Sequence, residues 1–248
     1  MQIPQYRLSF IQDADLWHHV KATVLKYRFR INLKDFNKNL IDPIKLTFDA
    51  EVYQKTLKEI IETEVLRQLD KSNTNWIGYF HQNIFKYINP EWTVPSKGYD
   101  IINQKQKIFV EMKNKHNTMN SSSAQKTYMR MQNTLLKDPN ANCYLVEVIA
   151  RNSQNQKWVI ALDGETVSNE KIRRISIDQF YFLVTGQSDA FQELCQVLPT
   201  VIKDVVQHIK EIKIENTVFE ELEKISPTLL SSLYLLAFEK YEGFNKLK

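Results

Sequence analysis

The chain has 248 residues, of which 43% are hydrophobic and 25% are charged. This composition is ordinary for a globular protein that buries a sizeable core, and it excludes an intrinsically disordered chain. The net charge of +4 at pH 7 gives only a mild indication of anionic partners.

The first part of the chain, residues 1–90, is predicted to be mainly helical. Its first fifteen residues lack the apolar stretch of a signal peptide, so we expect a cytoplasmic protein. Apolar residues then recur at helical spacing. This periodicity predicts helices over residues 16–28, 49–69 and 75–88, with Asp49 as an N-cap and a polar break at 70–74.

The middle of the chain, residues 91–185, is predicted to be an α/β core. Short apolar runs separated by polar turns predict strands over residues 98–102, 107–113, 143–150, 158–162 and 174–177. Helices are expected at 122–136 and 178–184. Trp158, Tyr181 and Phe182 are expected in the core, as are Cys143 and Cys195 in their reduced form, because no metal-binding cysteine spacing exists.

The last part, residues 186–248, is predicted to be helical with interruptions at Pro199 and Pro227. Its apolar run at 227–238 is shorter than the roughly 20 residues that cross a membrane, so no membrane association is expected. The whole pattern predicts one α/β domain over residues 1–248, with a central mixed β-sheet flanked by helices.

The hairpin formed by the first two predicted strands places acidic residues together. If its turn centres on residues 104–106, Asp100 lies opposite Glu111 or one position from it. Because side chains alternate along a strand, Glu111 and Lys113 share a face, while Val110 and Met112 point to the other. Side chains at opposed positions approach within about 5 Å.

Two carboxylates at this separation can share a Mg²⁺ ion, whose oxygen ligands lie about 2.1 Å away. The main-chain carbonyl of Met112 could complete the ligand set. Lys113 could contact a scissile phosphate, or orient and help deprotonate an attacking water. The hairpin therefore predicts a magnesium-dependent phosphodiesterase site; the alternative is an exposed hairpin with ordinary surface charges.

The region from Lys97 to Lys137 is strongly basic. It contains eight basic residues and two acidic ones, so it carries a net charge of +6, more than the whole chain. The two acids are Asp100 and Glu111 themselves. We therefore expect a phosphate-binding surface, although a solvated loop and helix face is the alternative. The candidate DNA-binding residues are Lys97, Lys115, His116, Asn117, Asn120, Ser121, Lys126 and Arg130.

The spacing of Asp100, Glu111 and Lys113 resembles the PD-(D/E)xK nuclease superfamily, with Tyr99 in place of the usual proline. The longer strings RQLDKSNTNWIGYFHQNIFKYI and GYDIINQKQKIFVEMKNKHNTMNSSSAQKTYMRMQ resemble type II restriction endonucleases that cleave GGNCC sites. The resemblance implies the restriction-endonuclease fold, use of Mg²⁺, and a homodimer in which each subunit cuts one strand of a near-palindromic site. It also implies double-stranded DNA as the substrate, a prokaryotic cell as the setting, and a cognate DNA methyltransferase as functional partner.

The family resemblance suggests one more metal ligand, because related folds sometimes supply an acid from an early helix. Glu64 is the candidate here; alternatively it is a surface glutamate paired with Arg67 or Lys71. His81 is expected to be structural. Two other functions stay open, namely a structure-specific repair or junction-resolving nuclease of the same superfamily, and a catalytically inactive DNA-binding relative.

Overall fold

The computed structural model describes residues 3–116, 118–209 and 214–244. The chain divides into two compact units. Unit 1 comprises Met1–Leu25 and Ile77–His208, and unit 2 comprises Lys26–Trp76 and Ile209–Lys248. We predicted one domain with three consecutive parts, whereas each observed unit combines two segments that are far apart in the sequence.

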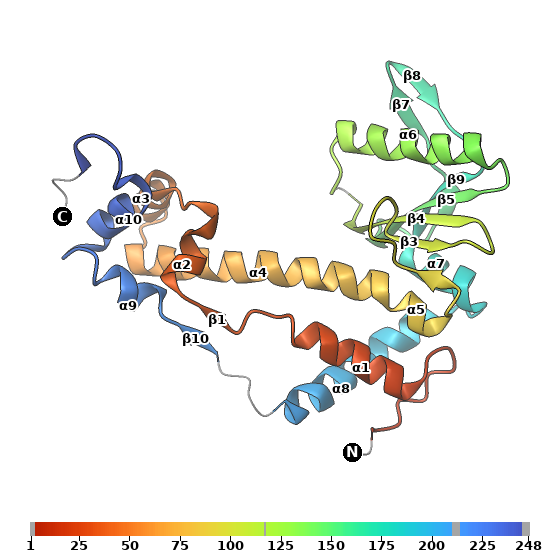
Figure 1. Ribbon diagram of the computed structural model, residues 1–248, viewed down its shortest axis with the longest axis horizontal. Helices are drawn as coiled ribbons and strands as arrows, with labels where there is room; N and C mark the ends of the chain where they lie inside the picture. The colour runs from red at the N-terminus through yellow and green to blue at the C-terminus, as the bar shows by residue number, and fades with distance from the viewer. Residues whose placement is uncertain (1–2, 117, 210–213, 245–248) are drawn as a thin grey trace. The chain divides into compact units, whose positions relative to one another are not determined.

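Unit 1 is built on a six-stranded sheet with the strand order β2-β3-β4-β5-β9-β6 (Figure 1). The strands β4, β5 and β9 are parallel, and the other neighbours pair antiparallel. The predicted mixed sheet is therefore confirmed. The strands are β2 (Trp92–Thr93), β3 (Ile101–Asn103), β4 (Ile108–Lys115), β5 (Asn142–Ile149), β6 (Asn155–Lys157) and β9 (Ile172–Ser176).

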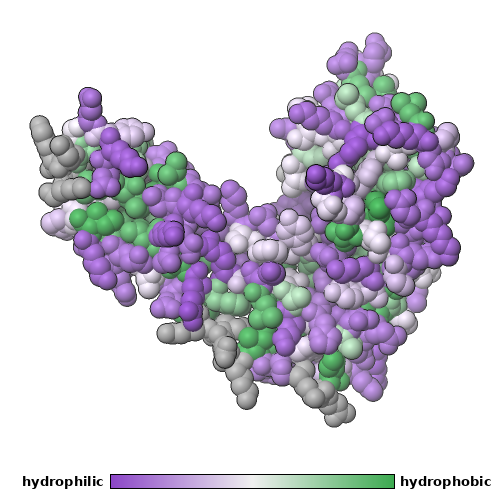
Figure 2. Space-filling model, viewed as in Figure 1, coloured by the Kyte–Doolittle hydropathy of each residue, from purple (hydrophilic) through white to green (hydrophobic). Residues whose placement is uncertain are grey.

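Helices cover both faces of this sheet. Figure 1 shows α6 (Ser121–Lys137) on one face and α7 (Ile177–Thr185) on the other. Tyr128 and Met131 of α6 pack on Cys143 and Leu145 of β5, because alternate residues of a strand face the same side. The same helix contacts the small hairpin of β7 (Ile160–Leu162) and β8 (Glu165–Val167). Figure 2 shows that hydrophilic residues cover most of unit 1 on the face in view.

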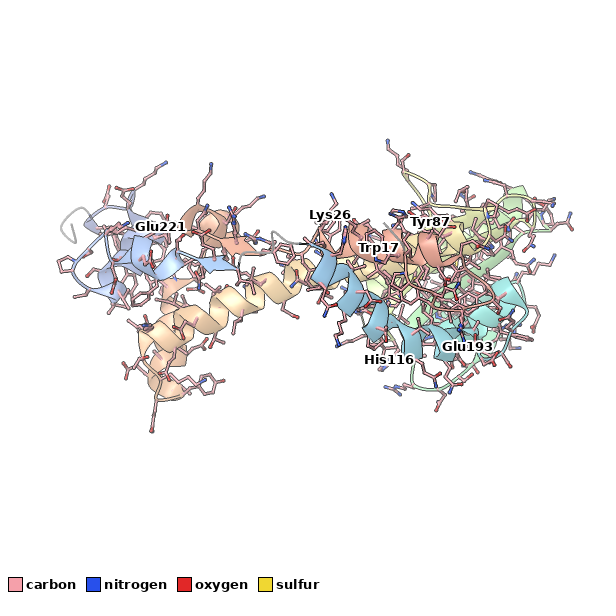
Figure 3. All side chains as sticks on the ribbon, turned by 90° about the horizontal axis from the view of Figure 1, so that it is seen from below. Trp17, Lys26, Tyr87, His116, Glu193 and Glu221 are labelled. Atoms are coloured by element: carbon pink, nitrogen blue, oxygen red, sulfur yellow. The ribbon has the colours of Figure 1, made fainter. Side chains whose placement is uncertain are left out.

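Other helices lie wholly within unit 1. They are α1 (Asp13–Val24), α5 (Phe85–Ile88) and α8 (Ala190–His208). Trp17 of α1, labelled in Figure 3, is buried and lies edge-on to His208 of α8 with ring centroids 5.4 Å apart. We predicted a break at Pro199, but α8 runs through it. Its buried Leu194, Val201 and Val205 hold the helix together on either side of the proline.

Unit 2 is mostly helical around its own core. Its elements are β1 (Arg30–Ile31), α2 (Leu33–Phe36), the 3₁₀ turn η1 (Asn37–Asn39), α3 (Pro43–Val52), β10 (Glu215–Asn216), α9 (Val218–Leu222) and α10 (Leu229–Phe238), with the first part of α4 (Leu57–Asn83). Phe36, Ile61, Val218, Leu222 and Leu233 are fully buried together. The parallel pair β1–β10 joins the two segments of the unit.

The predicted boundaries of the early helices are wrong. The expected helix 49–69 is interrupted between Val52 and Leu57, whereas the expected break at 70–74 is helical. Asp42, not Asp49, caps α3, because its side chain accepts hydrogen bonds from two N–H groups of the first turn. Residues 70–74 contain neither glycine nor proline, so their polarity alone does not end a helix.

The structure also differs from three smaller expectations. Cys143 is buried as predicted, but Cys195 is exposed. Trp158 and Tyr181 are buried, whereas Phe182 is 45% exposed. Of the expected strand 158–162, only residues 160–162 form a strand, β7, while β6 lies earlier and Trp158 lies between the two. No helix in the described part of the chain combines the length and apolar character needed to cross a bilayer.

Candidate active site

The β3–β4 hairpin has the predicted register. Ile101 pairs with Val110 and Asn103 pairs with Ile108. Just before β3, the N–H of Asp100 donates to the carbonyl of Val110 at 2.9 Å. This hydrogen bond is one residue out of the ladder register, so it holds the main chain of Asp100 beside Val110, one position from Glu111.

The Asp100 side chain turns back onto β4. Its Oδ2 accepts a hydrogen bond from the N–H of Met112 at 2.7 Å. The N–H and C=O of one strand residue point to the same side, so the Met112 carbonyl also lies on the side of Asp100. Burial raises the pKa of Asp100, and the nearby charge of Glu111 raises it further.

Glu111 is 8% exposed and is held by two cations. The Nζ of Lys113 donates to its Oε1 at 2.7 Å, and the Nη2 of Arg130 donates to its Oε2. A buried carboxylate is costly unless it is paired and hydrogen-bonded. The two cations offset this cost and fix the direction of the carboxylate.

Arg130 reaches Glu111 because α6 is anchored on the hairpin. The Nη1 of Arg130 donates to the carbonyl of Gly98 at 2.6 Å, and its guanidinium lies 4.8 Å from the centre of the Tyr99 ring. The Tyr99 hydroxyl is 2.7 Å from Oγ1 of Thr134, one turn along α6. Tyr99, the residue that replaces the family's usual proline, therefore ties the helix to the catalytic strand.

The oxygen atoms gathered here suit a hard divalent cation. Two carboxylates and a main-chain carbonyl are the ligands that Mg²⁺ prefers. Within the described ranges, no three His, Cys, Asp or Glu side chains gather as a metal-binding group. The site therefore offers two carboxylates, and any further ligand would be the carbonyl of Met112 or water.

Glu64 belongs to unit 2, where it has structural partners. Its carboxylate accepts two hydrogen bonds of 2.6 Å from Arg67 and one of 3.0 Å from Gln68. Gln68 is buried and also donates to the carbonyl of Phe36. These contacts fit the surface-pair alternative, and a metal-binding role of Glu64 stays a prediction.

The predicted DNA-binding residues have different surroundings. Five of them are exposed, namely Lys97, Lys115, Asn120, Ser121 and Lys126. Asn120 has a structural task, because its side chain caps α6 by accepting from the N–H of Ser123 at 2.9 Å. Arg130 is engaged with Glu111, and His116 is engaged with Arg151 and Arg174. Asn117 lies outside the described residues.

Two residues near Lys113 on the sheet, Glu147 and Arg174, were not predicted from the sequence as site residues. Glu147 of β5 pairs in register with Lys113 of β4, is only 2% exposed, and is bonded to Arg174 of β9. The available signal was an acid inside the apolar run CYLVEVI. A charged residue is almost never fully buried unless it is paired, so this glutamate required a partner.

Comparison with known proteins identifies relatives of the chain. A family model described as "Eco47II restriction endonuclease" matches residues 8–207. The chain is 32% identical over 212 residues to the type II restriction enzyme Sau96I of Staphylococcus aureus, which covers 81% of both chains. It is 30% identical over 214 residues to the type II restriction enzyme Eco47II of Escherichia coli, which covers 80% of this chain and 88% of that one.

Proposed function

The chain belongs to the Eco47II restriction endonuclease family, and from this premise we propose that it cuts DNA with Mg²⁺ at Asp100, Glu111 and Lys113. It is a type II restriction enzyme. For its target we propose a short near-palindromic duplex site of the GGNCC kind. The observation that supports the proposed site is the β3–β4 hairpin, where Asp100 bonds to the main chain on both sides of Glu111 and Lys113 bonds to the Glu111 carboxylate.

The carboxylates of Asp100 and Glu111, with the carbonyl of Met112, would hold the cation. When bound, Mg²⁺ polarises a phosphoryl oxygen and lowers the pKa of a coordinated water. Burial raises the pKa of Asp100, and the nearby Glu111 carboxylate raises it further. A bound divalent ion would favour the charged form of Asp100 and reduce its repulsion with Glu111.

The side chains around this ligand set have separate tasks. Lys113 is partly exposed, so its ammonium group can reach a phosphate while Glu111 keeps it in place. There it would either bind the scissile phosphate or orient the attacking water and help to deprotonate it. Arg130 balances the second oxygen of Glu111 and joins the carboxylate to the Gly98 carbonyl. It is therefore a positioning residue.

We further propose a homodimer as the active species. The described residues of one chain contain a single Asp–Glu–Lys site, while a duplex has two strands to cut. A twofold dimer places two such sites across a near-palindromic sequence, because the symmetry of the protein then matches that of the DNA. The protein would act in the prokaryotic cytoplasm beside a cognate methyltransferase that protects the same sequence.

The decisive experiment is digestion of plasmid DNA with Mg²⁺, followed by sequencing of the ends. Discrete fragments that share one end sequence are expected. Cleavage confined to branched substrates would instead indicate a structure-specific nuclease. Binding without cleavage at any Mg²⁺ concentration would indicate an inactive relative.

Variants of the site test its assignment. Glu111→Ala and Lys113→Ala should each lower the cleavage rate by at least about 10²–10³-fold, because each removes a preorganised charge from the reacting centre. DNA binding measured without metal should survive. Lys137→Ala is the matched control, since this exposed lysine lies at the far end of α6. Loss of folding in both site variants, seen by circular dichroism, would contradict the assignment.

A further inference from the structure

A polar pocket of about 470 Å³ opens beside the candidate active site. It lies at the carboxyl ends of the parallel strands β4, β5 and β9, together with the loop before β6, and all of its residues belong to unit 1. Figure 3 labels His116, which follows β4 and forms part of its wall. Its lining residues are His116, Glu147, Arg151, Asn152, Gln154, Gln156 and Arg174.

The pocket continues the face that carries the candidate active site. Glu147 pairs in register with Lys113, so both side chains point to the same side of the sheet. Gln156 pairs in register with Arg174 across β6 and β9, so these two also share a side. A duplex that brings a phosphate to Lys113 therefore presents neighbouring nucleotides to this pocket.

The interior of the pocket is fixed by a buried ion pair. The Nη2 of Arg174 donates to Oε1 of Glu147 and, at 3.1 Å, to the carbonyl of His116. Glu147 is nearly inaccessible to solvent. The buried Nε of Arg174 has no hydrogen-bond partner among the described residues. An arginine held in this way is ordered before any ligand arrives, which lowers the entropy lost on binding.

The outer wall carries donors and acceptors that remain accessible. Arg151 and Gln156 are exposed. The Nε of Arg151 donates to Nε2 of His116 at 3.0 Å, and the side-chain amide of Gln156 donates to Gln154 at 3.0 Å. Both contacts orient the side chains while each keeps further groups for a ligand, because a guanidinium has five N–H donors and an amide has both donors and an acceptor.

The chemistry of this lining fits base edges better than phosphates. Two arginines and one glutamate leave a net charge of only +1 if histidine is neutral, and three of the seven lining residues are neutral amides. Phosphate contacts position DNA and rely on positive charge, whereas base edges offer a mixture of donors and acceptors. In the major groove, arginine pairs with O6 and N7 of guanine, and glutamine can donate and accept at once.

We propose that this pocket reads base edges of the target duplex, with Arg151 and Gln156 in contact with the bases and Arg174 positioned by Glu147 at the floor. The chemical class of ligand is the guanine-containing edge of a G·C pair. This inference rests on the proposed DNA-cutting function, and it names the part of the chain that determines which sequence is cut.

The test compares Arg151→Lys with the wild type. This change keeps the positive charge but removes the planar fork that pairs with guanine. Binding is measured without metal to a short duplex that carries the cut sequence and to the same duplex with that sequence scrambled. Lys157→Ala is the matched control, because Lys157 is the exposed neighbour of Gln156 and points to the other face of β6.

We expect Arg151→Lys to reduce the preference for the cut sequence by about tenfold to a hundredfold, with little change in binding to the scrambled duplex. Lys157→Ala should keep the preference. Equal weakening on both duplexes, or an unchanged preference, would overturn the inference while leaving the DNA-cutting function intact. A wild-type protein that neither cuts duplex DNA nor prefers any sequence would overturn the proposed function itself, and the base-reading role with it.

Discussion

At the scale of single residues, the site depends on how Glu111 is balanced. Its carboxylate meets Lys113 from its own strand and Arg130 from α6. Lys113 was predicted from the alternation of side chains along a strand, which is local. Arg130 was predicted only as a DNA contact, because its ion pair with Glu111 depends on how α6 packs against the sheet, and no local pattern specifies that packing.

The pairing of Arg130 with Glu111 should appear as an energetic coupling. Arg130→Met should lower the free energy of unfolding by roughly 2 kcal/mol, because it leaves a largely buried carboxylate with one partner; the partial exposure of Arg130 keeps this below the value for a fully buried pair. Glu111→Gln in the same background should recover part of the loss. Urea unfolding of the two single variants and the double variant measures the coupling.

Two observations would argue against this view of Arg130. One is that the single changes add without coupling, which would make the contact incidental. The other is that Lys126→Met, at an exposed position of the same helix, is as destabilising as Arg130→Met. The loss would then reflect the helix and not the ion pair.

At the scale of elements, the β3–β4 hairpin and the helix α6 were predicted better than the early helices. The β3–β4 register follows from a short turn, and α6 follows from one apolar stripe, so both are encoded locally. The predicted bounds of the early helices were wrong because the polar segment 70–74 was interpreted as a helix break. The actual start of α4 is set by Thr56, whose hydroxyl accepts from the N–H of Glu59 at 3.3 Å, while Glu59 accepts from the N–H of Thr56 at 2.8 Å.

This reciprocal pair is a capping box, and it makes a prediction about α4. Thr56→Ala should lower the free energy of unfolding by about 1 kcal/mol, because it leaves an N–H group of the first turn without its acceptor. The control is Thr63→Ala, whose hydroxyl bonds back to the Glu59 carbonyl within the same helix. That change should be close to neutral in urea unfolding followed by circular dichroism. A loss of similar size in both variants would show that the box does not set the helix start.

At the scale of the whole molecule, local sequence patterns did not predict the division into two units. Unit 2 is closed by contacts between residues nearly two hundred positions apart, such as the hydrogen bond from Asn37 to the Leu236 carbonyl. The β1–β10 pair consists of two residues on each side. Strands this short carry no periodicity. The family match ends at residue 207, so the second segment of unit 2 lies outside it.

Unit 1 contains a buried histidine, His19, and a partly buried one, His81, that link its stability to pH. His19 is 4% exposed, stacks on Phe80 and is 2.9 Å from the Phe80 carbonyl through Nε2. Burial lowers the pKa of His19 and of His81 from 6.5 to about 4. This supports the expectation that His81 is structural, although its Nδ1 has no hydrogen-bond partner among the described residues.

The sign of the pH effect follows from proton binding. Between about pH 6.5 and pH 4 the unfolded chain protonates these histidines while the folded chain keeps them neutral. Protons therefore favour unfolding, and stability is lost as the pH falls through this window. Each histidine lowers the free energy of unfolding by up to about 3 kcal/mol between these two pH values. Urea unfolding at pH values above and within the window should show this decline.

A variant can assign the decline to one residue. His19→Gln should be less stable than the wild type near neutral pH, because it loses ring packing, but its stability should fall less steeply as the pH is lowered. His18→Gln, at the exposed neighbouring position, should keep the full slope. The carboxylates of the chain also titrate toward the lower end of this window in both variants, so only the difference between the two slopes reports on His19. Equal slopes would mean that the His19 ring protonates as readily in the folded state as in the unfolded one.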